Sequence, residues 1–478
     1  MPLQPLCVSS PHPKKWVFIL LFQQRSEFGD HGIFVEENAT QNEASFVVIG
    51  PGVRELRAGF GDFSPSGDKG ADWKSGDKIN LRFKEYSFKA NSKQDLYARF
   101  MDERKALVGP NHSRNLTPFS KTLELTAMYK NKNRRAELPF GHFYRTANGD
   151  GYLVGWVGGL MDTYALLAMN DPLSRERVLT TCDFAFGNYV NTETGDVIIY
   201  HSASGAMAPA GLVMASRYFH EPEFLEIAKE TAWFMYDKEI IGLGFTSGAC
   251  GDIMQDADSE SNFAFTESLM ALYYATSDKQ WLDMARNVAN IAATWTLTYD
   301  YQFPVNSIIS KLGGHVAGAV WASTQNKHAA PGVCTMSADH LFKIYGATGD
   351  QRYADLLRDI NHAHAEVMET PGRPTTGMGL GSSMERIQTT DADGKGAVGV
   401  ILYTSNGWTE GNGMLMGIEI PGIYLQTDKD EMYVFDHVDA KVVKRDKSGI
   451  TLEITNPTRF DASVSIFAEA SKEAFRIP

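Results

Sequence analysis

The segment Ser261-Asn-Phe-Ala-Phe-Thr-Glu-Ser-Leu-Met-Ala-Leu-Tyr-Tyr-Ala-Thr-Ser-Asp278 decides the fold of this 478-residue chain. Small and apolar residues dominate it up to Ala275, and the amphipathic segment Lys279–Thr296 follows a short polar corner. Two periodic segments joined by so few residues predict an antiparallel helical hairpin. Asp278 can accept hydrogen bonds from the free N–H groups that begin the second helix, so we interpret it as an N-cap.

The same pattern recurs at three other corners, which are Ala168-Met-Asn-Asp171, Tyr218-Phe-His-Glu221 and Ala347-Thr-Gly-Asp350. The first helices of the four hairpins are poor in charge and predicted to be buried on more than one side, whereas the second helices carry regular charges on one face. The first members are Gly151–Met169, Ala206–Tyr218, Ser261–Thr276 and Val333–Thr348, and the second members are Ser174–Val190, Glu223–Tyr236, Lys279–Thr296 and Gln351–Met368. An internal repeat of this kind predicts a mainly α fold, an (α/α)6 toroid of inner and outer helices.

Further helices are predicted at Phe119–Lys132, Trp408–Tyr424 and Val316–Gln325, which brings the count close to six hairpins. The flanks differ, because apolar and polar residues alternate in Lys78–Lys89 and again in Ile450, Leu452 and Ile454, as in half-buried strands. We therefore divide the chain into a β-rich region at 1–115, the barrel at 116–426 and a β-rich segment at 427–478. The flanking segments are expected to resemble β-sandwiches.

The composition excludes several classes of protein. With 45 Lys+Arg and 58 Asp+Glu the formal net charge is −13, which argues against a nucleic-acid surface. No apolar run approaches a membrane span, and the run Trp16–Phe22 is favoured as a buried strand over a signal-peptide core. The location stays open: periplasmic or secreted with a signal peptide, cytoplasmic without one. The four cysteines form no CxxC pair, so no metal and no cofactor are expected.

The connections that lead into the inner helices are long, unlike the corners. They are Asn191–Gly205, Lys238–Ser259, Thr298–Gly332 and Thr370–Gly407. Because every hairpin has the same sense, all four are expected on one end of the barrel, where the inner helices begin. Long loops of this length are usually functional, and free helix N-termini there would stabilise negative charge. The active site is therefore predicted at this end.

Carboxylates concentrate in one of these connections, in Cys250-Gly-Asp-Ile-Met-Gln-Asp-Ala-Asp-Ser-Glu260. Glycoside hydrolysis needs a carboxylic acid and a carboxylate, and a dense acidic cluster raises the pKa of one of its members. Helix capping combined with a solvated acidic loop is the alternative interpretation, and a calcium loop is another. The candidate catalytic residues are Asp258, Glu260, Asp150, Asp252, Asp256 and Glu410.

Aromatic residues, histidines and an arginine recur in the same connections and could bind a sugar. The candidates are Trp156, Tyr200, His201, Trp321, His328, Arg373 and Trp408. Aromatic rings can stack on sugar faces, and an arginine can clamp a carboxylate. Core packing of the tryptophans, hydrogen-bonded loop histidines and a solvated arginine are the structural alternatives.

The middle of the chain, roughly Thr117 to Gln426, resembles the six-hairpin (α/α)6-barrel glycosidases. The resemblance rests on Gly155-Trp-Val-Gly-Gly-Leu-Met-Asp-Thr-Tyr164, on Asp256-Ala-Asp-Ser-Glu-Ser261 and on the repeated corners. It implies a sugar site at the barrel mouth with an Asp or Glu acid and base, and it includes enzymes such as β-glucuronidases and unsaturated glucuronyl hydrolases. The catalytic pair is not matched residue by residue.

The first hypothesis is thus a glycoside hydrolase, exo-acting on oligosaccharides of a uronic-acid-containing polysaccharide. The main alternative is a polysaccharide lyase, with Tyr200 or another tyrosine abstracting a proton while His201 helps to neutralise the uronate. A sugar epimerase using His201 and His328 is a third hypothesis, and a non-catalytic glycan-binding module is a fourth. The oligomeric state is left open.

Overall fold

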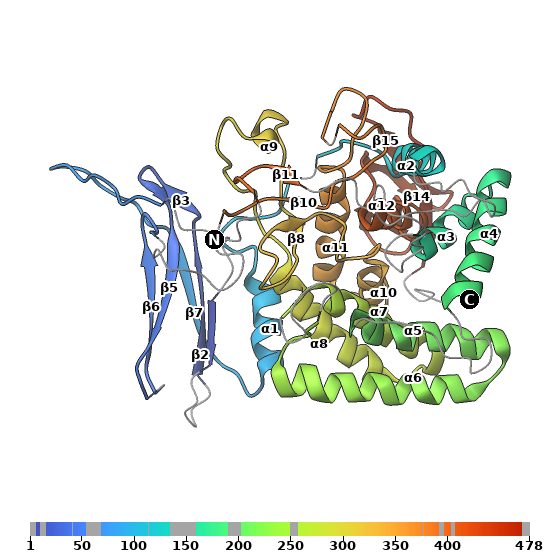
Figure 1. Ribbon diagram of the computed structural model, residues 1–478, viewed down its shortest axis with the longest axis horizontal. Helices are drawn as coiled ribbons and strands as arrows, with labels where there is room; N and C mark the ends of the chain where they lie inside the picture. The colour runs from blue at the N-terminus through green and yellow to red at the C-terminus, as the bar shows by residue number, and fades with distance from the viewer. Residues whose placement is uncertain are drawn as a thin grey trace.

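The computed structural model describes residues 6–9, 16–40, 42–53, 68–112, 114–133, 159–189, 202–248, 257–375, 377–391, 396–402 and 407–470. Helices dominate the middle of the chain, and small sheets lie at both ends (Figure 1). Within these residues no helix is both long and apolar enough to cross a bilayer.

Four helical hairpins form where the corners predict them. They are α3 (Gly159–Ala168) with α4 (Pro172–Tyr189), α5 (Ser202–Phe219) with α6 (Pro222–Met235), α7 (Glu260–Thr276) with α8 (Lys279–Trp295), and α10 (Asp339–Thr348) with α11 (Gln351–His364). A further pair, α12 (Gly407–Glu419) and α2 (Phe119–Asn133), joins residues from the two ends of the helical region. The described part of the chain therefore contains five helical pairs.

The corner carboxylates cap the second helices, as predicted. The Asp278 side chain accepts from Gln280 N at 3.0 Å, and that of Asp350 accepts from Arg352 N at 3.2 Å. At the first corner, Asp171 accepts from Ser174 N at 2.8 Å. Glu221 is the exception, because Pro222 opens α6 and the Glu221 side chain makes no cap bond. In three of the four corners, one local hydrogen bond thus caps the start of the second helix.

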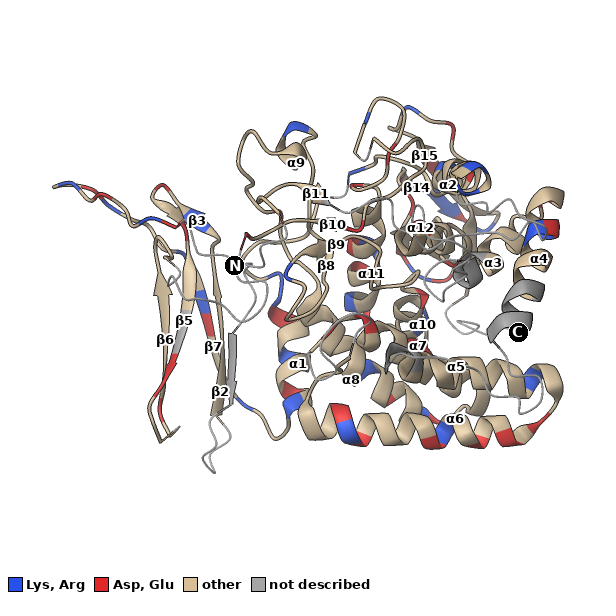
Figure 2. Cartoon of the chain, viewed as in Figure 1, with Lys and Arg blue, Asp and Glu red and all other residues tan. Residues whose placement is uncertain are grey.

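The helices form an inner and an outer layer. On the inner side α5 packs against α7, α7 against α10, and α12 against α3. Figure 2 shows the charges that run along α6, in contrast to α5, where Arg217 is the only charged residue. The fold class predicted from the sequence, a mainly α toroid of helical hairpins with β-rich ends, is confirmed.

Three predicted helices differ in the structure. The helix predicted at Trp408–Tyr424 ends at Glu419, and Tyr424 lies in the strand β12 (Ile423–Gln426), which pairs with two other strands. Val316–Gln325 contains the short strand β8 (Val320–Trp321), because Gly318 has a φ of +88° and a Cβ there would lie 1.9 Å from the Asp359 carbonyl oxygen. Val333–Thr348 is helical only from Asp339, because Met336 and Ala338 have φ values of 51° and 62°. A right-handed helix excludes both conformations.

The N-terminal region is built from an antiparallel sheet in the order β1 (Leu6–Ser9), β2 (Trp16–Phe22) and β7 (Phe83–Lys89). The strand predicted at Trp16–Phe22 is therefore confirmed. Shorter elements follow β2, namely β3 (Arg25–Ser26), β4 (Gly29–Asp30), β5 (Gly32–Glu37) and β6 (Ala44–Ile49). Helix α1 (Lys93–Glu103) packs against α8 and joins this region to the barrel.

The C-terminal strands dock on α10 and lie away from the N-terminal sheet (Figure 1). Strand β12 (Ile423–Gln426) lies between β13 (Glu431–Val434) and β16 (Ile466–Glu469), and β14 (Asp439–Asp446) pairs with β15 (Gly449–Thr455). The rings of Phe342 and Tyr424 lie 5.3 Å apart and those of Tyr345 and Tyr433 lie 5.2 Å apart. This aromatic contact anchors the tail to the inner layer.

Buried histidines join α11 to its neighbours. Nε2 of His364 lies 3.0 Å from the Thr409 carbonyl oxygen, and a Cβ at Gly413 would lie 2.3 Å from the His364 ring. The His362 ring stacks on that of His437 with centroids 4.3 Å apart. Burial lowers the pKa of His362 and that of His364 to about 4.

We expect the free energy of unfolding to fall as the pH drops from about 6.5 towards 4. Over that interval the unfolded chain binds protons at these two histidines and the folded chain does not, so each histidine contributes up to ~1.4 kcal/mol per pH unit. Urea midpoints measured between pH 7 and 5 test this. His364→Gln should flatten the profile, and the same change at the exposed His112 should not. A wild-type profile without slope in this range contradicts the expectation.

Candidate active site

Three of the four long connections meet beside the start of α7, and most of the fourth, Asn191–Gly205, lies outside the described residues. Strands β8 and β9 (Ala329–Ala330) from one connection pair with β10 (Arg386–Ile387) and β11 (Ile401–Leu402) from another, in one four-stranded sheet. Isolated bridges join Ser247 to Ala257 and Asp258 to Ser323. Three of the four connections are therefore tied together beside the N-terminus of α7.

Asp258 and Glu260 lie where this sheet meets α7. Oδ1 of Asp258 accepts from Ser261 N at 2.6 Å, so the carboxylate caps the helix, and the Asp258 N–H donates to the Thr246 carbonyl at 3.1 Å. Ser259 N donates to the Ala322 carbonyl at 2.9 Å. Asp258 is fully buried and Glu260 is 7 % exposed. The structural alternative for Asp258, helix capping, is therefore present. The capping bond involves Oδ1, one of the two carboxylate oxygens.

The facing connections add a third carboxylate with two basic side chains. Glu385 lies 3.0 Å from Nη2 of Arg386 and 4.0 Å from Nε2 of His328. His328 and Arg386 are both more than nine-tenths buried. We refer to Asp258, Glu260, His328, Glu385 and Arg386 as the mouth group.

The pKa of the buried Cys334 thiol is affected by all three carboxylates. Burial raises the pKa of its thiol, and the negative charges of Glu260, Asp258 and Glu385 raise it further, whereas a hydrogen bond with Ser259 acts in the opposite direction. Asp258 and Glu260 belong to one segment, and Glu385 lies more than 100 positions further along the sequence. Three acidic side chains from two distant segments therefore act electrostatically on one buried thiol.

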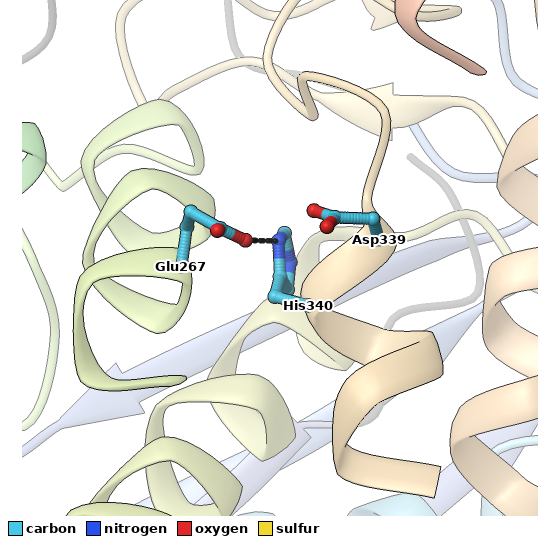
Figure 3. Close-up of side chains that lie close together, drawn as sticks. All are labelled: Glu267, Asp339 and His340. Atoms are coloured by element: carbon cyan, nitrogen blue, oxygen red, sulfur yellow. Dashed lines mark ion pairs between the residues drawn. The ribbon is translucent and has the colours of Figure 1, made fainter. Parts of the chain in front are cut away.

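A second polar cluster, absent from the sequence-based candidates, lies deeper between the inner helices (Figure 3). Glu267 comes from α7, Asp339, His340 and Lys343 come from α10, and Glu419 ends α12. Nζ of Lys343 lies 2.9 Å from Oε1 of Glu267 and 2.6 Å from Oδ2 of Asp339. We refer to these five residues as the lumen group. Glu267 follows Glu260 by seven residues. This two-turn spacing places both on one helix face, and it is the feature of the sequence that could have identified Glu267 as a site residue.

The lumen group holds its carboxyl groups in different protonation states. Burial, followed by the negative charge of Asp339, raises the pKa of Glu419 to about 8, so its carboxyl group is mostly protonated at pH 7. Ser337 donates a hydrogen bond to Glu419. The Lys343 and His340 charges hold the pKa of Glu267 well below its usual range, although burial opposes them.

Glu410, a catalytic candidate, faces the outer layer. It is fully buried, and Nζ of Lys130 on α2 lies 3.3 Å from its Oε2. The glycine-rich sequence around it makes room for the His364 ring at Gly413. Trp408 of the same helix is 6 % exposed and belongs to the main core. These placements favour a structural role for both residues.

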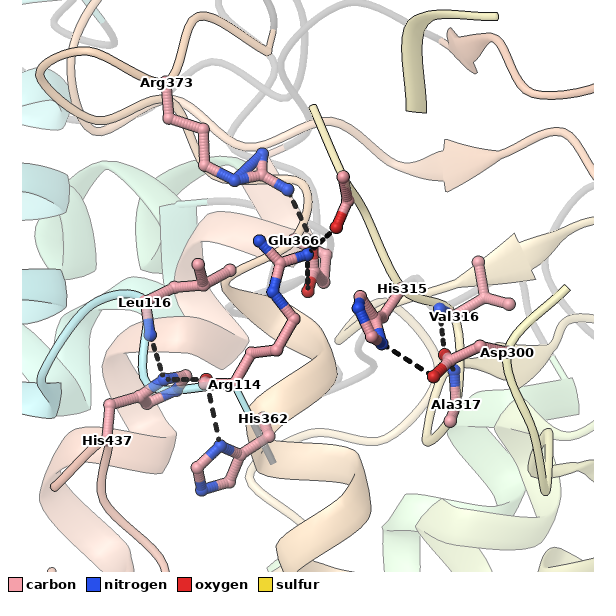
Figure 4. Close-up of polar contacts among 11 residues, drawn as sticks. Arg114, Leu116, Asp300, His315, Val316, Ala317, His362, Glu366, Arg373 and His437 are labelled. Atoms are coloured by element: carbon pink, nitrogen blue, oxygen red, sulfur yellow. Dashed lines mark hydrogen bonds and ion pairs between the residues drawn. The ribbon is translucent and has the colours of Figure 1, made fainter. Parts of the chain in front are cut away.

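Arg373 lies in a buried ion-pair network on the flank (Figure 4). Its Nη2 lies 2.5 Å from Oε2 of Glu366, and Nη1 of Arg114 lies 3.1 Å from Oε1 of the same carboxylate. Nearby, Nδ1 of His315 lies 2.6 Å from Oδ2 of Asp300. The structure therefore does not bring Arg373 to the mouth group.

Trp321 lies on β8 and packs, half-buried, against the smaller core cluster that includes Ala329. It neighbours the strand that leads from His328, so these two candidates share one hairpin. The remaining candidates lie outside the described residues; they are Asp150, Asp252, Asp256, Trp156, Tyr200 and His201.

No protein-family model matches the sequence, and no curated protein matches it either. Among solved structures, the chain is similar to a GH76 α-mannanase of Bacteroides thetaiotaomicron, with 15 % identity, 68 % of this chain and 93 % of that chain covered, and a TM-score of 0.32.

An unsaturated glucuronyl hydrolase of Streptococcus agalactiae shows 9 % identity, 68 % and 91 % coverage and a TM-score of 0.40. A D-mannose isomerase shows 12 % identity, 52 % and 68 % coverage and a TM-score of 0.30. Glycosidases are thus among the solved structures to which the chain is similar, as the resemblance predicted. The likeness is one of fold.

The buried pair of Lys130 and Glu410 generates a stability prediction. Lys130→Met leaves the Glu410 charge without its ammonium partner in the interior, so we expect a loss of about 3–5 kcal/mol in the free energy of unfolding. In the double variant Lys130→Met, Glu410→Met both charges are removed, and we expect a smaller loss. Urea denaturation of the two variants measures the difference. A single variant as stable as the wild type would show that Glu410 does not depend on Lys130.

Proposed function

We propose that this protein is a glycoside hydrolase that removes sugars from the ends of oligosaccharides derived from a uronic-acid-containing polysaccharide. The acid and base of the reaction come from the carboxylates of the mouth group. The observation that carries the proposal is that Asp258 and Glu260, at the start of α7, are bridged to the sheet whose connections bear Glu385, His328 and Arg386.

Three carboxylates in one place supply both functions that glycosidic cleavage requires. One protonates the leaving oxygen, and another either activates water or attacks the sugar. Like charges held this close favour protonation of one member, which is the state a general acid needs at neutral pH.

The positive charges at the mouth support an anionic substrate. Arg386 lies beside Glu385, and the free N–H groups at the start of α7 add partial positive charge. An arginine can bind a uronate carboxylate through two parallel hydrogen bonds. A substrate carboxylate would therefore compete with Glu385 for the guanidinium group.

The burial of the mouth group supports action on chain ends. Asp258 has no exposed surface, and His328 and Arg386 are more than nine-tenths buried within or next to the four-stranded sheet that the long connections build. A site enclosed in this way admits a terminal sugar more readily than the middle of a long chain.

The substrate class can be tested with para-nitrophenyl glycosides, among them a glucuronide, and with uronic oligosaccharides. We expect new reducing ends without absorbance from a carbon–carbon double bond. Asp258→Asn, Glu260→Gln and Glu385→Gln should each be compared with the wild type. At one or two of these positions the activity should fall ~10²-fold or more, as for a general acid or base.

Glu221→Gln is the matched control, because Glu221 is an exposed carboxylate on an outer corner and makes no cap bond. Its activity should equal that of the wild type. Asp→Asn changes at Asp150, Asp252 and Asp256 test the remaining catalytic candidates in the same assay. Uniformly mild losses at all mouth carboxylates would contradict the assignment of the pair. Products that absorb through a new double bond would identify a lyase instead.

A further inference from the structure

His340 is the least satisfied member of the lumen group. It is fully buried, and neither ring nitrogen makes a hydrogen bond within the described residues. Its nearest polar approach is from Nδ1 to Oε2 of Glu267 at 3.6 Å, which is an ion-pair distance beyond normal hydrogen bonding (Figure 3). Phe263 holds the ring from one side, with centroids 5.7 Å apart. A buried imidazole thus points at a carboxylate oxygen that has no hydrogen-bond partner in the described structure.

Lys343 contacts one oxygen of each of two carboxylates, so the other oxygen of each could bind a second cation. Its Nζ contacts Oε1 of Glu267 and Oδ2 of Asp339. Oε2 of Glu267 faces Nδ1 of His340 on the other side. One donor atom from each of Glu267, Asp339 and His340 can be chosen so that all three lie within 4.8 Å of one another.

We propose that Glu267, Asp339 and His340 form a binding site for a divalent transition-metal ion of the Zn²⁺ type. Two donor atoms bound to one tetrahedral Zn²⁺ at about 2.1 Å lie roughly 3.4 Å apart. The measured separation of Nδ1 and Oε2 is 3.6 Å, so these two donors are already placed to share an ion. An Asp339 carboxylate oxygen lies within 4.8 Å of both and is the third candidate ligand.

The charges around the site favour an added cation. Glu267 and Asp339 meet at one lysine, and Glu419 approaches from the end of α12. From α7, the Tyr274 hydroxyl is buried without a hydrogen-bond partner in the described residues. Two carboxyl groups, those of Glu267 and Asp339, therefore contact one ammonium group. A divalent ion would add positive charge between Glu267 and Asp339, which share this one lysine.

The donor set selects the kind of ion. One imidazole nitrogen and two carboxylate oxygens suit Zn²⁺, whereas Mg²⁺ and Ca²⁺ prefer oxygen donors alone. Three protein ligands leave a coordination position for water or a substrate oxygen. The side chains of Glu267 and Asp339 are 23 % and 15 % exposed, so this position can be reached from the lumen. No metal is predicted at these three residues from the sequence, and this site is independent of the proposed hydrolase activity.

The test uses the full chain without an affinity tag, stripped of metal with a chelator and titrated calorimetrically with Zn²⁺. We expect one equivalent to bind and no binding of Mg²⁺ or Ca²⁺ at the same concentration. Glu267→Gln and His340→Gln should each weaken Zn²⁺ binding by at least about 100-fold, since even outer-shell changes cost 10–100-fold. Lys343→Met should strengthen it, because the change removes a competing positive charge.

His112→Gln is the control for adventitious binding, because His112 is an exposed histidine far along the chain from the site; its affinity should equal that of the wild type. Co²⁺ bound to the wild type gives a second readout, the visible absorption of a four-coordinate ion, which needs no variant to fold. The proposal is wrong if wild-type protein binds no stoichiometric Zn²⁺ or if bound Co²⁺ lacks this spectrum. It is equally wrong if Glu267→Gln and His340→Gln, folded by circular dichroism, bind Zn²⁺ like the wild type.

Discussion

The short capped corner is the constraint on which the rest of this structure depends. A carboxylate such as Asp278 or Asp350 accepts the first free N–H groups of the outer helix, so the chain reverses within a few residues. Every hairpin consequently has the same sense, and each long connection must return to the same end. The mouth group follows from this geometry, because it forms where three of those connections are tied into sheet and bridge contacts.

Burial on two sides explains the composition of the inner layer and the placement of its charges. An inner helix touches its own partner and its neighbours, so it tolerates few charged residues, and each of these needs a partner. Three buried ion-pair groups in the described residues illustrate this condition. Lys130 pairs with Glu410, Arg373 and Arg114 share Glu366, and Lys343 joins Glu267 to Asp339. Only the third of these groups combines a lysine with an excess of carboxyl groups and an unsatisfied histidine.

The comparison of sequence and structure separates local from long-range information. The outer helix predicted at Lys279–Thr296 forms at Lys279–Trp295, because its period and its cap are both local. The helix predicted at Val333–Thr348 begins only at Asp339, since Asn412 donates to the carbonyls of Gly332 and Val333 and the chain then turns through two left-handed residues. A local sequence pattern cannot predict a hydrogen bond with a side chain some 80 positions away.

The sequence by itself determined the class of fold, the sense of the hairpins and the end of the toroid at which the long connections gather, since periodicity and capping act over a few residues. It also placed Asp258, Glu260 and His328 among the candidates. Only the tertiary structure decided that Glu385 and Arg386 join them, that Glu410 turns to Lys130, and that Glu267 meets Asp339 and His340. The physical reason is that burial and ion pairing depend on which distant segments pack together, and charge type alone does not reveal the partner.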